Sequence, residues 1–147
     1  MSDRRDIEEL ARLAIDAGFH IHSELGPGLF ESVYEAMLVL KLSEVGLSVQ
    51  RQAPISIEYE GVSLGEGFRA DLLIENRLIV EVKSIERLSP LHTKQVLTYL
   101  RLLQQPLGLL MNFGGATFRE GIKRVVNDHT SLASHLRINQ VPTLTIE

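Results

Sequence analysis

The sequence predicts an α/β domain in which helices flank a mixed central β-sheet. Two segments near the N-terminus place apolar residues at helical spacing, and short runs rich in β-branched residues follow them. A helix opened by Ser89-Pro90 then leads into a nearly unbroken apolar run at residues 107–113, which is typical of a strand buried on both faces. A strand, a helix and a second strand in this order indicate a right-handed crossover unit within one sheet.

The composition is that of a single globular domain. The chain has 147 residues, of which 44% are hydrophobic and 23% are charged, and this is enough for a real core. We assign residues 1–127 to one domain and residues 128–147 to a C-terminal tail. The absence of cysteine excludes disulfides and thiolate metal sites and fits a reducing compartment.

Charge and hydropathy restrict the partners of the protein. A formal net charge of -4 argues against the constitutive, salt-sensitive binding to the nucleic-acid backbone that is typical of basic proteins. Any nucleic-acid contact must therefore be local or bridged by a metal. The first residues contain no apolar signal core, and no apolar run is long enough to span a bilayer. We therefore expect a soluble, cytoplasmic protein with no membrane partner.

Two amphipathic helices are expected in the first third of the sequence. The first covers about residues 7–22, and His22 continues its apolar stripe, where a histidine is more often a core or helix-end residue than a ligand. A Gly-Pro-Gly turn separates it from a second helix at about residues 29–45. On this helix Glu31 and Glu35 share a flank with leucines. Either these acids simply favour a helix N-terminus, or one of them reaches an acidic site elsewhere in the fold.

The strands are expected after the second helix. Pro54 excludes a central ladder position in its neighbourhood, so this region is interpreted as short edge pieces at residues 47–52, 55–59 and 62–64. A Gly-Glu-Gly loop at residues 65–67 leads on to two apolar, β-branched runs at residues 70–74 and 78–82. The three residues between these runs predict a tight turn, and therefore a hairpin.

The predicted hairpin brings two acids together. With a loop of three residues, Asp71 lies opposite Glu81 on the same side of the sheet, with the Cβ atoms roughly 4.5–5.5 Å apart. Two poorly solvated carboxylates repel each other unless one stays protonated or a cation bridges them. A divalent ion such as Mg²⁺ satisfies this requirement, and Lys83 faces the same site. The alternative is a structural salt-bridge cluster at the end of a strand.

The last elements are a helix and two strands. The helix at about residues 90–104 places Gln95 and Tyr99 one turn apart, with Gln95 at the margin of its apolar face, where a glutamine is usually just solvated. The apolar run at 107–113 follows it, and alternation at residues 122–126 predicts one more strand.

The ordered set of motifs resembles the PD-(D/E)XK nuclease superfamily, in particular its branch of RecB-like exonucleases. The resemblance rests on an acidic helix, then Asp71, then Glu81-x-Lys83 on the paired strand, then Gln95-x-x-x-Tyr99 on a helix. Glu-x-Lys alone is a weak signal, whereas the ordered set is specific. The resemblance implies a restriction-endonuclease-like core, which is a mixed central sheet flanked by helices.

A second resemblance is closer. Residues 28–34, which read G-L-F-E-S-V-Y, match the signature that names the GxxExxY family. Other blocks similar to those of that family lie at residues 25–28, 67–71, 112–114 and 121–124. Together the matching segments extend over about residues 7–127, which is nearly the whole predicted domain.

The resemblance also implies roles for single residues. Asp71 and Glu81 would bind Mg²⁺ or Mn²⁺, and Glu31 would complete or orient the site. Lys83 would orient the attacking water and stabilise charge on the phosphate, while Gln95 would help to position Lys83 or the substrate. The candidate substrate contacts are Tyr99, Arg69 and His22.

The expected activity is metal-dependent hydrolysis of phosphodiester bonds in DNA, or in RNA. The rival interpretation is a catalytically inactive nuclease-fold module that binds or regulates. The presence of Asp71, Glu81 and Lys83 together favours the enzyme, because a degenerate member would be expected to lose one of them. A small-molecule enzyme is a third possibility, and it predicts an enclosed apolar pocket rather than an open acidic cleft. A homodimer is left open.

Overall fold

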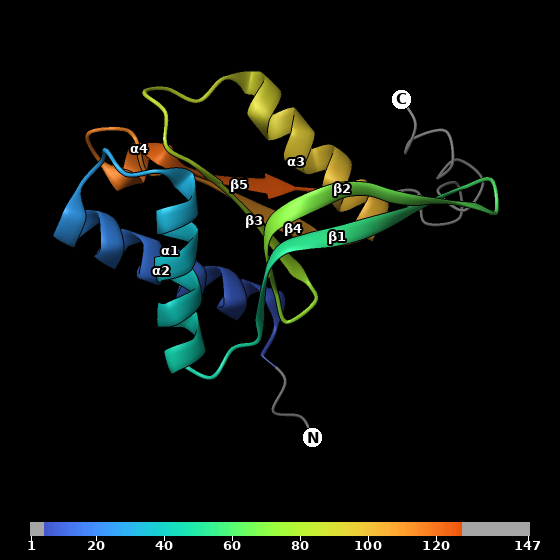
Figure 1. Cartoon of the computed structure of the whole chain (residues 1–147), viewed down its shortest axis with the longest axis horizontal. Coiled ribbons are helices and arrows are strands. Elements are labelled where there is room, and N and C mark those ends of the chain that lie inside the picture. Colours follow the sequence, from blue (N-terminus) through green and yellow to red (C-terminus); the bar gives the residue numbers. More distant parts are fainter. Residues whose placement is uncertain (1–4, 128–147) are drawn as a thin grey trace.

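A computed structural model describes residues 5–127, which form a five-stranded mixed sheet with helices on both faces (Figure 1). The strands lie in chain order, β1-β2-β3-β4-β5, and all neighbours are antiparallel except the parallel pair β3 and β4. This confirms the predicted α/β class. The elements are α1 (Ile7–Leu25), α2 (Glu31–Glu44), β1 (Val49–Tyr59), β2 (Val62–Ile74), β3 (Leu78–Lys83), α3 (Pro90–Leu103), β4 (Leu107–Asn112), α4 (Phe118–Gly121) and β5 (Ile122–Val126).

The two faces of the sheet carry separate cores. Helices α1 and α2 pack on one face and α3 covers the other, as Figure 1 shows. Strand β3 serves both faces, because Leu78, Val80 and Val82 join the core under α1 and α2, whereas Ile79 joins the core under α3. Period-2 geometry places Glu81 on the side of Ile79, so this acid faces α3.

Strands β1 and β2 form one long hairpin, and this corrects two predictions. The break expected near Pro54 and the loop expected at residues 65–67 are both absent, since β1 and β2 are continuous through these positions. Pro54 is tolerated because β1 is an edge strand, where one backbone donor can be missing. Glycine at position 67 of β2 makes room for the Ile57 side chain, which a Cβ at that position would overlap.

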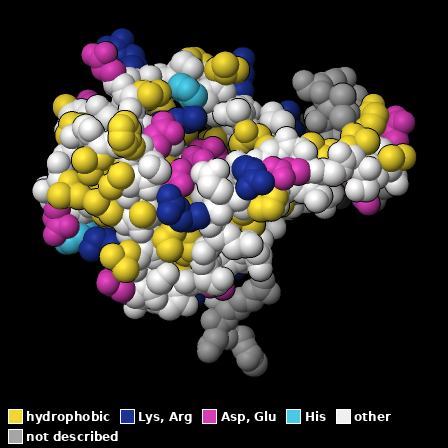
Figure 2. All heavy atoms as spheres, viewed as in Figure 1, with side chains coloured by type: hydrophobic (Ala, Val, Ile, Leu, Met, Phe, Trp, Pro, Cys, Tyr) yellow, Lys and Arg dark blue, Asp and Glu magenta, His cyan; other side chains and the backbone are white. Residues whose placement is uncertain are grey.

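The outer part of this hairpin, residues 56–67, projects from the body of the molecule and is called the arm below (Figures 1 and 2). Its β2 side is exposed from Val62 to Gly67. Register shifts interrupt the pairing with β1 within the arm, and such irregularities increase strand twist. The arm therefore leaves the sheet at its inner end, close to Asp71.

One element lies outside the sequence predictions, and one prediction lies outside the described residues. The short helix α4 was not anticipated, and the Thr117 side chain caps it by accepting from the Glu120 N–H. The predicted tail at residues 128–147 lies outside the described residues. Within residues 5–127, the structure has no helix that combines the length and the apolar character needed to cross a membrane.

Candidate active site

The register of the β2–β3 hairpin sets the site. Leu72 pairs with Val80, Leu73 with Ile79 and Ile74 with Leu78. These pairs confirm the predicted three-residue loop at 75–77. Continued by one residue, the same register places Asp71 across from Glu81.

Carboxylates join the two strands beyond the last regular pair. The Asp71 N–H donates to Glu81 Oε2 at 3.0 Å, and the Val82 N–H donates to Asp71 Oδ2 at 2.8 Å. Each acid thus satisfies a backbone donor of the opposite strand, in place of a backbone carbonyl. Regular pairing of β2 with β3 ends at Leu72 and Val80, and the two carboxylates bridge the strands beyond it; this place is called the acidic opening below.

The environment of Glu81 changes its acid strength. Only 6% of Glu81 is exposed. Burial, followed by the negative charge of Asp71, raises the pKa of Glu81 to about 8, although the positive charge of Lys83 opposes the shift. In the absence of a cation, burial and the charge of Asp71 therefore favour the protonated form of Glu81.

Lys83 lies two residues beyond Glu81 on the same strand and therefore on the same side of the sheet. Its side chain is partly exposed. None of the ion pairs found among residues 5–127 involves Lys83. Its ammonium group is therefore available to a ligand at the acidic opening.

Gln52 is a site residue that the sequence analysis missed. Its Nε2 lies 3.2 Å from Asp71 Oδ1 and 3.3 Å from Glu35 Oε1, so it connects an acid of α2 to the carboxylate pair. Gln52 has a positive φ of 49°, which is unusual for a residue other than glycine within a strand. No local sequence signal marks it, because its role depends on the pairing of β1 with β2 and on the approach of α2 to β1.

The two glutamates of α2 have different places. Glu35 is buried, its pKa is raised by burial and then by the charge of Asp71, and Gln52 and Arg51 oppose this shift. Glu31 instead accepts from the Ser84 N–H at 3.2 Å, just past the end of β3. Glu35 thus lies on the Asp71 side of the site, whereas Glu31 lies beyond Lys83, at Ser84.

No three His, Asp or Glu side chains within residues 5–127 come close enough together to form a metal-binding group. The structure thus brings Asp71 and Glu81 together but does not add Glu31 to them as a third neighbour. A role for Glu31 as a metal ligand stays a prediction.

Helix α3 brings Tyr99 near the acids. The Tyr99 ring stacks on Phe68, with centroids 3.7 Å apart and planes 4° from parallel. Its pKa is raised first by burial and then by the charges of Glu81 and Asp71, which places the hydroxyl within their electrostatic reach. Gln95, one turn earlier, is exposed, and among the described residues no hydrogen-bond partner is found for its side chain.

Arg69 and His22 have other partners. Arg69 Nε lies 2.8 Å from Glu66 Oε2 on the exposed side of β2. The His22 ring is buried, lies 3.0 Å from the Gly115 carbonyl oxygen through Nε2, and packs beside Phe113. The His22 contacts fasten the 113–118 segment to α1. Arg69 also donates to the Gln52 carbonyl at 3.4 Å, but neither Arg69 nor His22 bonds to the carboxylate pair.

Figure 2 shows Asp and Glu side chains gathered where the arm leaves the body, with Lys and Arg side chains around them.

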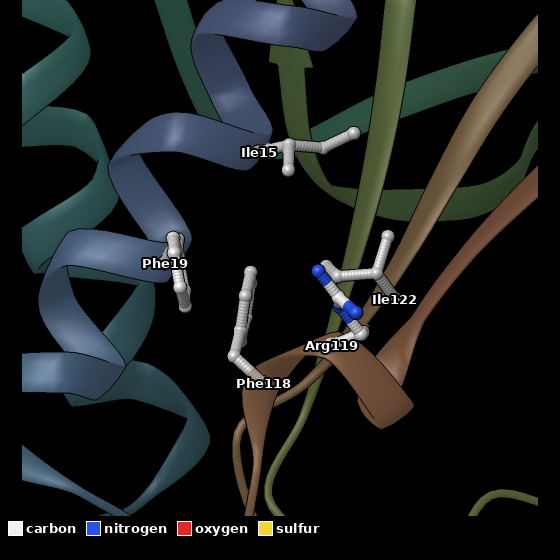
Figure 3. A pocket seen from close by; sticks show the side chains of 5 residues that line it. All are labelled: Ile15, Phe19, Phe118, Arg119 and Ile122. Carbon is white, nitrogen blue, oxygen red and sulfur yellow. The ribbon is translucent and has the colours of Figure 1, made fainter.

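A separate apolar pocket of about 320 Å³ lies between α1 and α4 (Figure 3). Phe19 and Phe118 stack across it with centroids 6.4 Å apart. None of the predicted site residues lines this pocket, so it does not replace the acidic opening as the candidate active site.

One family of known proteins matches the chain over most of its length. The family profile of the PD-(D/E)XK nuclease superfamily matches residues 8–125. The search of curated proteins finds no match. Among solved structures, the crystal structure of SSO0001 is similar, with 15% sequence identity over 92% of this chain and 86% of that chain and a TM-score of 0.43. Because the profile covers more than half of the residues, the chain belongs to the PD-(D/E)XK nuclease superfamily.

Proposed function

We propose that this protein is a metal-dependent nuclease that hydrolyses phosphodiester bonds. The observation that carries the proposal is the pair formed by Asp71 and Glu81, which crosses the opening between β2 and β3 with Lys83 beside it. Membership of a nuclease superfamily supports the same activity. We further propose that the chain belongs to the GxxExxY family within the RecB-like branch, on the motifs at residues 28–34 and 95–99.

The donor set suits a small divalent cation. Mg²⁺ is usually held by one or two protein carboxylates together with water and substrate oxygens, and two carboxylates converge here. Burial makes an ionised Glu81 unfavourable unless a positive charge is supplied nearby. We propose Mg²⁺ or Mn²⁺ on Asp71 and Glu81, with Glu31 as a more distant orienting group beside Ser84.

Each residue of the chain has a distinct task in this proposal. When bound, the metal supplies Lewis acidity toward the phosphate and an activated water. Lys83 places a positive charge beside the same opening, where negative charge develops on the phosphoryl oxygens. Gln52 holds the Asp71 side chain toward the opening by donating to Oδ1.

The proposed substrate contacts come from two elements. Tyr99 and Gln95 lie on α3, on the side of the sheet that Glu81 faces, and would contact the strand near the scissile bond. Arg69 would act at the base of the arm once Glu66 released it. The contacts of His22 suit positioning of the 113–118 segment better than substrate binding.

The test is a cleavage assay on labelled single- and double-stranded DNA and RNA with Mg²⁺ or Mn²⁺. We expect the wild-type protein to cleave, and to cleave DNA in preference to RNA. Glu81→Gln and Lys83→Met should each lower the rate by at least about 100-fold, because the first removes a proposed metal ligand and the second removes a positive charge beside the phosphoryl oxygens.

Matched controls remove the same charges elsewhere. Glu58→Gln changes an exposed acid of the arm, and Lys123→Met changes an exposed lysine of the edge strand β5. Both should retain wild-type activity. Tight binding of nucleic acid without cleavage by the wild-type protein would contradict the proposal and support the inactive binding module.

A further inference from the structure

A groove of about 430 Å³ begins immediately beyond Lys83. Residues 27–30, before and at the start of α2, form one wall, and residues 84–86, after β3, form the other, with Gly114 also lining the space. Ser84 is the next residue after Lys83, and its N–H bonds to Glu31. The groove is therefore lined by the residue that directly follows Lys83, and Glu31 of α2 bonds to that residue.

The first wall is held rigidly by a buried tyrosine. The hydroxyl of Tyr34, which is fully buried, donates to the Gly26 carbonyl at 2.6 Å and accepts from the Leu29 N–H at 3.3 Å. Ser84 Oγ donates to the Leu29 carbonyl at 2.6 Å. These bonds fasten the 26–29 turn to α2 and to the opposite wall.

The second wall is held by a buried asparagine. Asn112 Oδ1 accepts from the Ile85 N–H at 3.0 Å, and Asn112 Nδ2 donates to the Ile85 carbonyl at 2.9 Å. Gly114 lets the chain approach closely, because a Cβ there would overlap the Ile85 backbone. Phe113, which lies between Asn112 and Gly114, stacks on Tyr34 with centroids 4.3 Å apart. The residues that support the two walls are therefore packed together.

Phe30 occupies this rigid frame with its ring in solvent. The residue is 80% exposed and lines the groove, although a phenylalanine of this size gains free energy on burial. A rigid backbone that keeps a large aromatic ring in water beside an active site is suited to a ligand that covers the ring.

The charges of the groove indicate which part of a nucleotide would bind. Among residues 5–127, no lysine or arginine lines it, and Glu86 is the only charged residue that does. A phosphate would be repelled there, whereas a neutral, planar base would not. Base stacking on an aromatic side chain is tolerant of sequence and is a general mode of single-strand recognition.

We propose that this groove binds an unpaired nucleobase, stacked on Phe30, from the strand whose phosphate lies at Asp71 and Glu81. The substrate is then a single strand, or a duplex with an unpaired nucleotide beside the scissile bond. This inference rests on the proposed function for the nature of the ligand. The shared chemistry is the planar base, which both DNA and RNA supply.

The absence of tryptophan from the chain allows a direct test. Phe30→Trp introduces a single indole at the groove, and a Glu81→Gln background prevents cleavage during the measurement. We expect oligo(dT) or oligo(U) to quench this fluorescence by at least about 30% through stacking, and a blunt, fully paired hairpin to leave it unchanged. Comparing the two oligonucleotides separates deoxyribose from ribose strands as the preferred source of the base.

Phe19→Trp in the same background is the matched control. Phe19 is also an exposed aromatic, at 61%, but it lies on α1 at the pocket of Figure 3. Its fluorescence should not respond to either oligonucleotide. Equal responses at both positions, or no response at Phe30→Trp, would overturn the inference.

A second pair of variants tests the aromatic face itself. Phe30→Leu keeps an apolar side chain but removes the ring, and it should weaken binding of a single strand by about 5-fold or more, the lower end of what one stacked base contributes. Phe30→Tyr should bind within about twofold of wild type. Unchanged affinity in Phe30→Leu would contradict the proposal.

The cleavage assay separates this inference from the proposed function. Cleavage by the wild-type protein without a response at Phe30→Trp would overturn the base site and leave the nuclease proposal intact. A response at Phe30→Trp without cleavage by the wild-type protein would support the base site and overturn the nuclease proposal.

Discussion

At the scale of single residues, the fold changes the chemistry of Glu81 most. Its side chain is almost fully buried on β3, a strand that is covered on both faces, and it lies beside the charge of Asp71 on β2. Burial and the charge of Asp71 also raise the pKa of Glu35, but hydrogen bonds donated by Gln52 and Arg51 oppose this shift. The acids of this site therefore favour protonation or a bound cation.

We expect the metal-free protein to lose stability as the pH rises from about 4.5 to about 8. The unfolded chain releases the Glu81 proton near the ordinary pKa of 4.5, whereas the folded protein holds it until about 8. Over this interval the folded state binds more protons, so the free energy of unfolding falls by up to about 1.4 kcal/mol per pH unit. Thermal denaturation in EDTA across the interval measures the effect.

Glu81→Gln should reduce this pH dependence without removing it, because the raised pKa of Glu35 acts in the same direction. Glu58→Gln, on the exposed part of β1, should follow the wild type. A slope in Glu81→Gln equal to that of the wild type would show that Glu81 does not hold the proton.

At the scale of elements, the start of α2 depends on bonds from outside the helix. Its N-cap residue, Phe30, contributes no side-chain cap. The preceding turn contains Gly26 and Gly28, both with positive φ, so its backbone conformation suits glycine. The order of this turn therefore rests on Tyr34 and Ser84, which bond to it from α2 and from the end of β3.

Tyr34→Phe should lower the free energy of unfolding by about 1 kcal/mol or somewhat more, because the Gly26 carbonyl and the Leu29 N–H lose a partner. The melting temperature should fall by a few degrees, as measured by thermal denaturation. The same change should also weaken single-strand binding, since Phe30 is carried by the loosened turn.

Tyr59→Phe is the control for Tyr34→Phe. Tyr59 lies in the arm, and no hydrogen bond of its hydroxyl is found among the described residues, so this variant should melt like the wild type. Equal effects of the two substitutions would contradict the role given to the Tyr34 hydroxyl.

At the scale of the whole molecule, the site lies between the part of the sheet that helices cover on both faces and the part that projects as the arm. Strands β3 and β4 are covered on both faces, while β1 and β2 leave the body as the arm beyond Ile55 and Phe68. The carboxylate pair lies at the boundary between these regions and joins β2 to β3. Neutralising that pair should consequently stabilise the sheet as a whole.

Saturating Mg²⁺ or Mn²⁺ should raise the melting temperature. A cation that binds only the folded state at a hundredfold excess over Kd adds about 2.7 kcal/mol. For a domain of this size this corresponds to an increase of about 5–10 °C. Thermal denaturation with and without the metal measures the gain.

The gain should disappear in Glu81→Gln and persist in Glu58→Gln, since only the first variant loses a proposed ligand. A wild-type protein whose melting temperature is insensitive to divalent cations would indicate that Asp71, Glu81 and Lys83 form a structural ion-pair cluster.

Local sequence patterns are sufficient to predict the register that creates the site. Three residues separate two β-branched runs, and an odd loop places Asp71 opposite Glu81 because side chains alternate with a period of two. The Ser-Pro start of α3, the apolar run of β4 and the strand at 122–126 were also predictable. These features depend on local periodicity and turn chemistry, which the sequence displays directly.

The contacts between distant segments follow from tertiary packing and not from local sequence. Strands β1 and β2 run through glycines and a proline that locally indicate breaks, because pairing along their length outweighs local preference. Glu35 meets Asp71 through Gln52, while Glu31 meets Ser84, which is 53 positions away. The groove likewise joins residues 27–30 to 84–86. Such contacts depend on how the elements pack, and no short stretch of sequence contains that information.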